Sequence, residues 1–150
     1  MGFLDEIYKD IILDHYKKPR NRGTAEDIAA EDVKVISQEG LNPSCGDELL
    51  LHLAIETSTE ARLKDVRFSG EGCAISQASA SMMTVALRGK SIDEALALSQ
   101  HFKEMIQGKG INESLGELKM LQCISKLHAR VKCATLAWVT LEQALLNQKR

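Results

Sequence analysis

The fold is decided by residues 49–55, which read Leu49-Leu50-Leu51-His52-Leu53-Ala54-Ile55. Leucine or isoleucine stands at every second position, and successive side chains of a strand point to opposite faces of a sheet. The pattern therefore predicts a strand with one apolar face made of Leu49, Leu51, Leu53 and Ile55, while Leu50, His52 and Ala54 point the other way. The apolar face must be covered, so the sheet needs helices packed on it.

Two shorter alternations flank this strand. Val33 and Val35 alternate with polar neighbours, which predicts a short strand running toward Ser37. Val66 and Phe68 stand on either side of one polar residue and predict a third strand. Three strands that follow one another closely in sequence favour an antiparallel meander over parallel crossover units.

The rest of the chain shows helical spacing. A first helix is predicted to end near Tyr16, before the break at Pro19 and Gly23. Its apolar positions are Phe3, Leu4, Ile7, Tyr8 and Ile11. After the third strand, apolar stripes occur at Ile75, Ala78, Met82 and Val85, and again at Ala137, Leu141, Ala144 and Leu145. Between them we expect a helix opened by the capping box of Ser91 and Glu94, and a weaker helix over roughly 112–127.

These elements predict the α+β class, with a three-stranded antiparallel sheet and helices packed on it in a single domain over residues 1–150. The 150 residues are 44% hydrophobic and 27% charged, which is ordinary globular usage. A net charge of −2 gives no field that would attract nucleic acid or an acidic membrane. No export signal or apolar run of roughly 20 residues is visible, so we expect a cytoplasmic protein with reduced cysteines.

Three of the four cysteines stand at predicted element boundaries. Cys45 lies in the turn Asn42-Pro43-Ser44-Cys45-Gly46-Asp47, between the first two strands. Cys73 follows the third strand and precedes a helix, whose dipole favours a thiolate. Cys133 stands where the last helix opens, next to the cation of Lys132. This placement favours metal or thiolate chemistry over the alternative that the three are small buried hydrophobic side chains.

The candidate ligands are Cys45, Asp47, Cys73 and Cys133. Three thiolates and one carboxylate would make a four-coordinate site suited to zinc. A carboxylate is unusual in closed structural zinc sites, so its presence indicates an exchangeable position. A purely structural zinc module is the alternative, whereas a thiol oxidoreductase is disfavoured because the sequence has no C-x-x-C pair.

The remaining cysteine and the histidines are interpreted as structural or solvated. Cys123 lies inside a predicted helix with no turn or glycine beside it, which indicates a spectator thiol. The histidines are His15, His52, His101 and His128, and none has the i, i+4 pairing of a helical metal site. Only His128 is retained as a candidate ligand, in place of Asp47, because it lies close in sequence to Cys133.

Several ordered motifs resemble the U-type iron–sulfur cluster assembly proteins, the family of IscU and of the N-terminal domain of NifU. The resemblance covers nearly the whole chain and rests on Leu4, Tyr8, residues 12–16, 19–21, Gly23, residues 42–47, 70–76 and 130–138. The chain is most similar to the SufU branch, because Lys132 replaces a histidine and residues from roughly 89 to 115 look inserted. The Leu-Pro-Pro-Val-Lys chaperone-docking motif of IscU is also absent, since residues 128–132 read His-Ala-Arg-Val-Lys.

The resemblance implies an α+β fold with an exposed site made by Cys45, Asp47, Cys73 and Cys133. SufU-like proteins hold zinc there and accept sulfur from a SufS-like cysteine desulfurase, which implies Cys45 as the persulfide acceptor. Other cluster assembly or acceptor proteins would be further partners. IscU-like members instead assemble an iron–sulfur cluster on the same residues, so a scaffold that holds iron is the alternative. The resemblance therefore leaves two alternatives for the activity of this protein, a sulfurtransferase-like acceptor and a non-catalytic scaffold.

Overall fold

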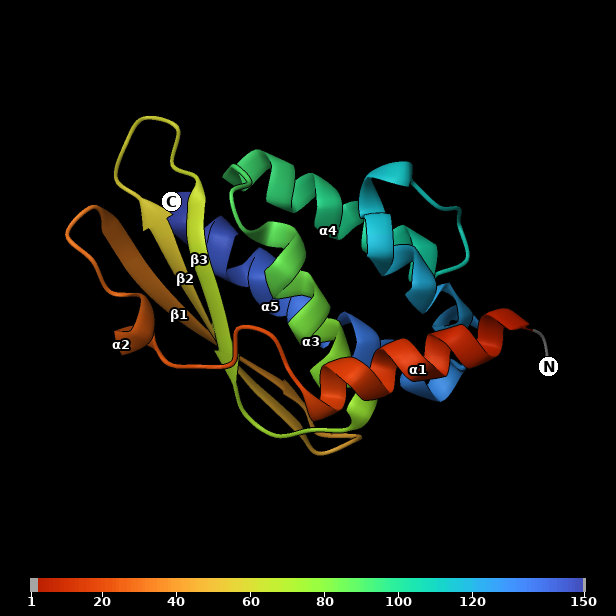
Figure 1. Ribbon diagram of the computed structural model, residues 1–150. Helices are drawn as coiled ribbons and strands as arrows, with labels where there is room; N and C mark the ends of the chain where they lie inside the picture. Colours follow the sequence, from red (N-terminus) through yellow and green to blue (C-terminus); the bar gives the residue numbers. More distant parts are fainter. Residues whose placement is uncertain (1–2, 150) are drawn as a thin grey trace.

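The chain folds around the predicted antiparallel meander. The structure is a computed structural model that describes residues 3–149, and it describes side chains for residues 9–147. The strands are β1 (Val33–Asn42), β2 (Asp47–Glu56) and β3 (Leu63–Ser69), hydrogen-bonded in the order β1-β2-β3 (Figure 1). β1 runs past its predicted end near Ser37 because it pairs with β2 over its whole length, from Val33 opposite Glu56 to Asn42 opposite Asp47.

The long helices cover one face of the sheet, and the opposite face is only partly covered, with Leu41 and Leu50 exposed on it. Leu49, Leu51, Leu53 and Ile55 are at most 4% exposed on the face toward the long helices, as predicted. On the other face lies the short helix α2 (Ala25–Ile28), and His52 is buried beneath it. Sequence analysis missed α2 because Ile28 is its one buried side chain. The available signal was the cap, in which Thr24 N–H donates to Asp27 Oδ2 at 2.8 Å.

The helices pack as the apolar face of the sheet requires. They are α1 (Phe3–Lys17), α3 (Ala74–Leu87), α4 (Ile92–Ile106), α5 (Val131–Lys149) and two 3₁₀ segments, η1 (Glu113–Lys126) and η2 (His128–Arg130). α5 packs on β1 and β2, and α3 packs on β3 (Figure 1). Val85 was predicted on the apolar stripe of α3 but is 52% exposed, whereas Ser79, Ser81 and Thr84 of the same helix are buried, so the apolar stripe did not mark the buried face correctly. The predicted stripe at Phe3, Leu4, Ile7 and Tyr8 lies outside the described side chains.

Residues 113–126 form a 3₁₀ helix instead of the predicted weak α-helix. Their buried side chains are Leu115, Leu118, Leu121 and Ile124, at a spacing of three residues, which is the repeat of a 3₁₀ helix. Gly116 interrupts the segment with φ 56° and ψ −128°, a conformation open only to glycine. The three-residue spacing of the leucines is present in the sequence, but the prediction assumed an α-helix because that is the commoner type.

A buried contact fixes α3 against α5. The ring of Trp138 stacks on Phe102 with centroids 4.6 Å apart, and Trp138 Nε1 donates to Ser79 Oγ at 3.2 Å. The Ser79 hydroxyl in turn donates to the carbonyl oxygen of Ala134 at 2.6 Å. These contacts hold the first turns of α3 and α5 in register, so the residues that begin the two helices keep a fixed separation.

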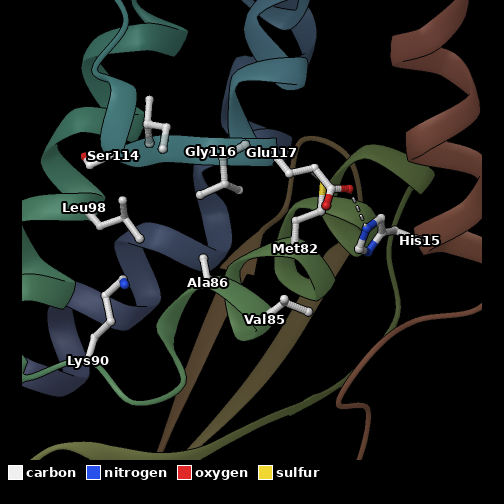
Figure 2. Close-up of a pocket in the computed structure, with 11 residues that line it drawn as sticks. His15, Met82, Val85, Ala86, Lys90, Leu98, Ser114, Gly116 and Glu117 are labelled. Carbon is white, nitrogen blue, oxygen red and sulfur yellow. Dashed lines mark hydrogen bonds and ion pairs between the residues drawn. The ribbon is translucent and has the colours of Figure 1, made fainter.

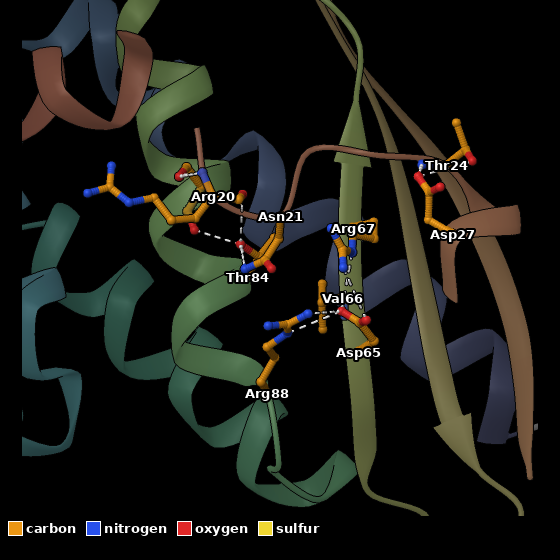
Figure 3. Close-up of polar contacts among 10 residues, drawn as sticks. Arg20, Asn21, Thr24, Asp27, Asp65, Val66, Arg67, Thr84 and Arg88 are labelled. Carbon is orange, nitrogen blue, oxygen red and sulfur yellow. Dashed lines mark hydrogen bonds and ion pairs between the residues drawn. The ribbon is translucent and has the colours of Figure 1, made fainter. Parts of the chain in front are cut away.

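The segment after α1 is tied to β3 and α3. Arg20 N–H donates to Ser81 Oγ at 2.8 Å, and Asn21 Nδ2 donates to Thr84 Oγ1 at 3.0 Å (Figure 3). At the far end of α3, Arg88 pairs with Asp65 of β3. These polar contacts hold the C-terminal half of α3 against the segment after α1 and against β3.

A cavity of about 240 Å³ lies between α3, α4 and η1. Its lining includes Met82, Ala86 and Leu98, with His15 at one edge, and none of the cysteines (Figure 2). The buried ring of His15 is hydrogen-bonded to Ser81 Oγ at 2.8 Å through Nδ1 and lies 3.4 Å from Glu117 through Nε2. His15 therefore connects α1 to α3 and η1, which is the structural one of the two roles, structural or solvated, expected from the sequence.

Within residues 3–149, no helix combines the length and the apolar character that crossing a bilayer requires.

The two buried histidines should make the fold sensitive to acid. Burial and the nearby charge of Arg20 lower the pKa of His15, and burial lowers the pKa of His52. In the unfolded chain a histidine has a pKa near 6.5, so below that pH the unfolded chain binds protons that the folded chain does not yet bind. The contribution of these histidines to stability is therefore complete above that pH and is lost as the pH falls. In metal-free protein we expect the free energy of unfolding, from urea titrations, to decrease between about pH 7 and pH 5.

His15→Gln should flatten this decrease, because one of the two proton-binding differences is removed. The exposed His128 gives the matched control, and His128→Gln should leave the pH dependence as in the wild type. An unchanged slope in His15→Gln would show that His15 is not the group responsible.

Candidate metal centre

Three segments that are distant in sequence meet at one end of the sheet. The turn between β1 and β2 carries Cys45, the loop after β3 carries Cys73, and the first turn of α5 carries Cys133. Figure 1 shows the β1–β2 turn and the β3–α3 loop at the same end of the molecule. One thiol sulfur each from Cys45 and Cys133 and a carboxylate oxygen of Asp47 lie within 4.8 Å of one another. The structure therefore brings together three of the four predicted ligands.

The turn presents Cys45 at the surface. Cys45 N–H donates to the carbonyl oxygen of Asn42 at 3.2 Å, and Gly46 N–H donates to that of Pro43 at 3.3 Å. Gly46 takes a left-handed φ of 69°, which glycine adopts without strain, and the chain then enters β2. The side chain of Cys45 is half-buried at the tip of this turn, where it faces both the protein and solvent.

Asp47, the first residue of β2, is 2% exposed and is held by both carboxylate oxygens. Oδ1 accepts the backbone N–H of Cys73 at 2.8 Å, and Oδ2 accepts Nδ2 of Asn42 at 3.1 Å. A buried carboxylate needs such partners, and two of them fix its orientation. Each oxygen still has a lone pair for an ion. Asn42 is a site residue that sequence reasoning missed, because its contact with Asp47 depends on the pairing of β1 with β2.

Cys73 caps the N-terminus of α3, as predicted. Its sulfur accepts the backbone N–H of Ser76 at 3.5 Å. Cys73 lies beside the group of three, since its hydrogen bond and its charge both contribute to the raised pKa of Cys133. Its part as the fourth ligand stays a prediction. Gly72 allows this loop to approach Asp47 closely, because a Cβ atom there would lie 2.7 Å from Asp47 Oδ1.

Cys133 is fully buried beneath Cys45. Its thiol donates to the Cys45 sulfur, with the two sulfurs 3.1 Å apart. Burial raises the pKa of the Cys133 thiol strongly, and the hydrogen bonds with Cys45 and Cys73 raise it further. The exposed Arg130 stands over the group, and the pKa of its guanidinium is raised by its hydrogen bond with Cys133 and by the charges of the cysteines. The cation that the structure places beside the thiols is therefore Arg130, whereas Lys132 was the one named from the sequence.

These donor atoms fit a zinc ion. In a tetrahedral site with Zn–S bonds near 2.3 Å, neighbouring sulfur ligands lie roughly 3.8 Å apart. The two sulfurs lie 3.1 Å apart, and both lie within 4.8 Å of a carboxylate oxygen of Asp47, so the three donor atoms are close enough together to contact one ion. Cys45, Asp47 and Cys133 would hold the ion, with Cys73 as the expected fourth ligand.

A cavity of about 450 Å³ opens over Cys45. Its walls come from the turn, through Asn42 and Ser44, and from the segment of η2 and α5 that carries His128, Arg130 and Lys132. His128 lies on this wall and is not one of the three grouped ligands. The cavity gives Cys45 access to solvent, whereas Cys133 has none.

The exposed site that the family resemblance implied is only partly exposed. Asp47 and Cys133 are 2% and 0% exposed, because α5 packs over the end of the sheet. Cys45 and Cys73 are half-buried. Cys123 is half-buried in η1, packs against the hydrophobic core and is not one of the three grouped ligands, and its role as a spectator stays a prediction.

Comparison with known proteins agrees with this fold and identifies the family. The chain belongs to the NifU-like N terminal domain family, whose model matches residues 7–150. It is 43% identical to the zinc-dependent sulfurtransferase SufU of Bacillus subtilis, over 97% of this chain and 94% of the relative. It is 39% identical to the iron–sulfur cluster assembly scaffold protein IscU of Streptococcus pyogenes, over 95% of this chain and 84% of the relative.

A solved structure has the same architecture. It is that of a candidate iron–sulfur cluster assembly scaffold protein for the SUF system from Fervidobacterium islandicum AW-1, with a TM-score of 0.80 and 37% sequence identity. The match covers 96% of this chain and 99% of the other. The sequence-based identification of the family is therefore confirmed, and SufU is among the similar curated relatives.

Gly72→Ala should weaken metal binding. The new methyl group would lie 2.7 Å from Asp47 Oδ1 and 2.5 Å from Ser76 Oγ, so the loop or the carboxylate must move. Misplacing a ligand's supporting contacts typically costs about ten- to a hundredfold in metal affinity. We expect a loss of that size in competition titrations of zinc against a chromophoric chelator.

Gly89→Ala is the matched control, because Gly89 has a φ of 83° and open space around its Cα. This control should lose about 1 kcal/mol of stability from backbone strain and keep the wild-type zinc affinity. Equal zinc affinity in Gly72→Ala and the wild type would show that the close approach of Gly72 to Asp47 does not shape the site.

Proposed function

We propose that this chain acts in iron–sulfur cluster biogenesis as a zinc-dependent sulfur acceptor, which takes persulfide sulfur from a cysteine desulfurase at Cys45. The family and the relatives support the assembly role, and the geometry of the thiols supports the choice of Cys45. The residues that would hold zinc are Cys45, Asp47, Cys73 and Cys133.

The observation that carries the proposal is the difference between two adjacent thiols. Cys45 stands at the tip of a turn and opens into a cavity of about 450 Å³. Cys133 is fully buried, and burial raises the pKa of its thiol. A partner's persulfide can reach the first sulfur and not the second, and a thiolate is the reactive form in sulfur exchange. Cys45 is therefore the acceptor.

The transfer itself is a thiol exchange reaction. The Cys45 thiolate attacks the outer sulfur of the desulfurase persulfide, the S–S bond of that persulfide breaks, and the desulfurase cysteine leaves as a thiolate. The product is a persulfide on Cys45, so no outside oxidant or reductant is needed.

Zinc, when bound, would keep the thiols deprotonated and, being redox-inert, would leave the transferred sulfur unchanged. The chain's own contribution is to hold the ligands in place. Asp47 is fixed by Cys73 N–H and by Asn42, and Cys73 is fixed by its capping contact with Ser76.

The surface around Cys45 is suited to an anionic sulfur donor. His128, Arg130 and Lys132 line the cavity, and all three are exposed. The cations of Arg130 and Lys132 at the rim of the cavity would attract a persulfide anion and so favour its approach to Cys45. This supports a cysteine desulfurase as the partner, because that enzyme class delivers sulfur as a protein-bound persulfide.

A scaffold for cluster assembly is the second candidate function, and the 39% identity to the Streptococcus pyogenes scaffold protein supports it. In that case the cluster would be cargo bound at the same residues. Anaerobic reconstitution with iron and sulfide separates the two. A stable chromophore at one cluster per chain, transferable to an acceptor, supports the scaffold, whereas a chain that keeps zinc and refuses iron supports the sulfur acceptor.

The central test is desulfurase turnover with and without the protein, in samples of known zinc content. We expect the zinc form to stimulate turnover and Cys45→Ser to abolish the stimulation, because the accepting sulfur is gone. Cys123→Ser is the matched control and should stimulate like the wild type. An equal loss in Cys123→Ser, or full stimulation by Cys45→Ser, would contradict the assignment of Cys45.

A further inference from the structure

Both donor hydrogens of the Asn42 side-chain amide are directed at candidate ligand atoms. Its Nδ2 lies 3.1 Å from Asp47 Oδ2 and 3.7 Å from the sulfur of Cys133. The amide group has two N–H donors, so these contacts use its full donor capacity. Asn42 is 6% exposed, which leaves little room for water to compete for either contact.

The orientation of the amide follows from chemistry. An amide flip would bring Oδ1 against the carboxylate oxygen of Asp47, where two acceptors would repel each other. The nitrogen must therefore face Asp47. The backbone of Asn42 is engaged as well, since its carbonyl oxygen accepts the N–H of Cys45 and closes the turn. One residue thus contacts three of the four candidate ligands.

We propose that Asn42 is a positioning residue of the metal centre, which sets how long the site retains zinc. The proposal rests on the zinc site of the proposed function. Asn42 restrains rotation of the Asp47 carboxylate, places a hydrogen-bond donor against the Cys133 sulfur, and fixes the turn that carries Cys45. Such outer contacts orient the ligands and change the charge density on a metal-bound sulfur.

A merely structural role for Asn42 makes a different prediction. Asn42 is the last residue of β1 and pairs with Asp47 across the sheet. If it only stabilised this end of the hairpin, its loss would lower the stability of the fold and leave the bound metal unchanged. A positioning role predicts a change in the metal itself, in its release rate and in the spectrum of a substituted ion.

The experiment compares zinc release from the wild type and from Asn42→Ala, using a chromophoric chelator in excess. We expect release from Asn42→Ala to be about tenfold faster, at the lower end of the effect seen for outer-sphere contacts. Asn42→Ser, which keeps a small polar side chain, is the second variant and should also release zinc faster than the wild type. With Co²⁺ in place of zinc, we expect Asn42→Ala to shift the visible absorption bands.

Asn112→Ala is the matched control. The Asn112 side chain caps η1 by accepting Ser114 N–H at 2.9 Å, and Asn112 does not line the cavity over Cys45. Its loss should destabilise the fold with no change in zinc release or in the Co²⁺ spectrum.

Unchanged release and an unchanged Co²⁺ spectrum in both Asn42 variants would overturn the positioning role while leaving the zinc site intact. A wild-type protein that binds neither zinc nor Co²⁺ would instead overturn the zinc-dependent function. The two failures are thereby distinguished.

Discussion

The buried carboxylate of Asp47 is the constraint on which the metal centre depends. It stands at the start of β2, accepts the N–H of Cys73 at the start of α3, and accepts the amide of Asn42 at the end of β1. A buried carboxylate without these partners would be costly. The ionised Asp47 therefore holds the end of β1, the start of β2 and the start of α3 together. The packing of Trp138 between Phe102 and Ser79 then places Cys133 of α5 against the same group.

This arrangement gives adjacent cysteines different properties. Cys45 is on a turn that opens to a cavity, Cys73 is engaged as a helix cap, and Cys133 is buried as a thiol of raised pKa. The site therefore combines the buried Asp47 and Cys133 with the sulfur of Cys45, which opens to a cavity. That combination is what a sulfur acceptor needs, because the sulfur must arrive without the site coming apart.

The sequence predicted the sheet, because the alternation at residues 49–55 leaves one arrangement for the leucines, and it predicted that Cys73 lies between the third strand and a helix. It did not predict how deeply Cys133 is buried, since burial depends on how α5 packs against the sheet. The contacts of Asn42 could not be predicted from the sequence either, because Asp47 and Cys133 become its neighbours only through strand pairing and helix packing. The 3₁₀ form of η1 was readable in the three-residue spacing that begins at Leu115.

The most direct test of the account is to locate the sulfur after transfer. The zinc-loaded protein would be incubated anaerobically with a cysteine desulfurase and cysteine, then trapped with an alkylating reagent and digested for peptide mass spectrometry. The account predicts that the peptide carrying Cys45 is one sulfur atom heavier, and that the peptides carrying Cys73, Cys123 and Cys133 are unchanged. Extra sulfur on Cys133 or Cys123 with none on Cys45 would contradict it.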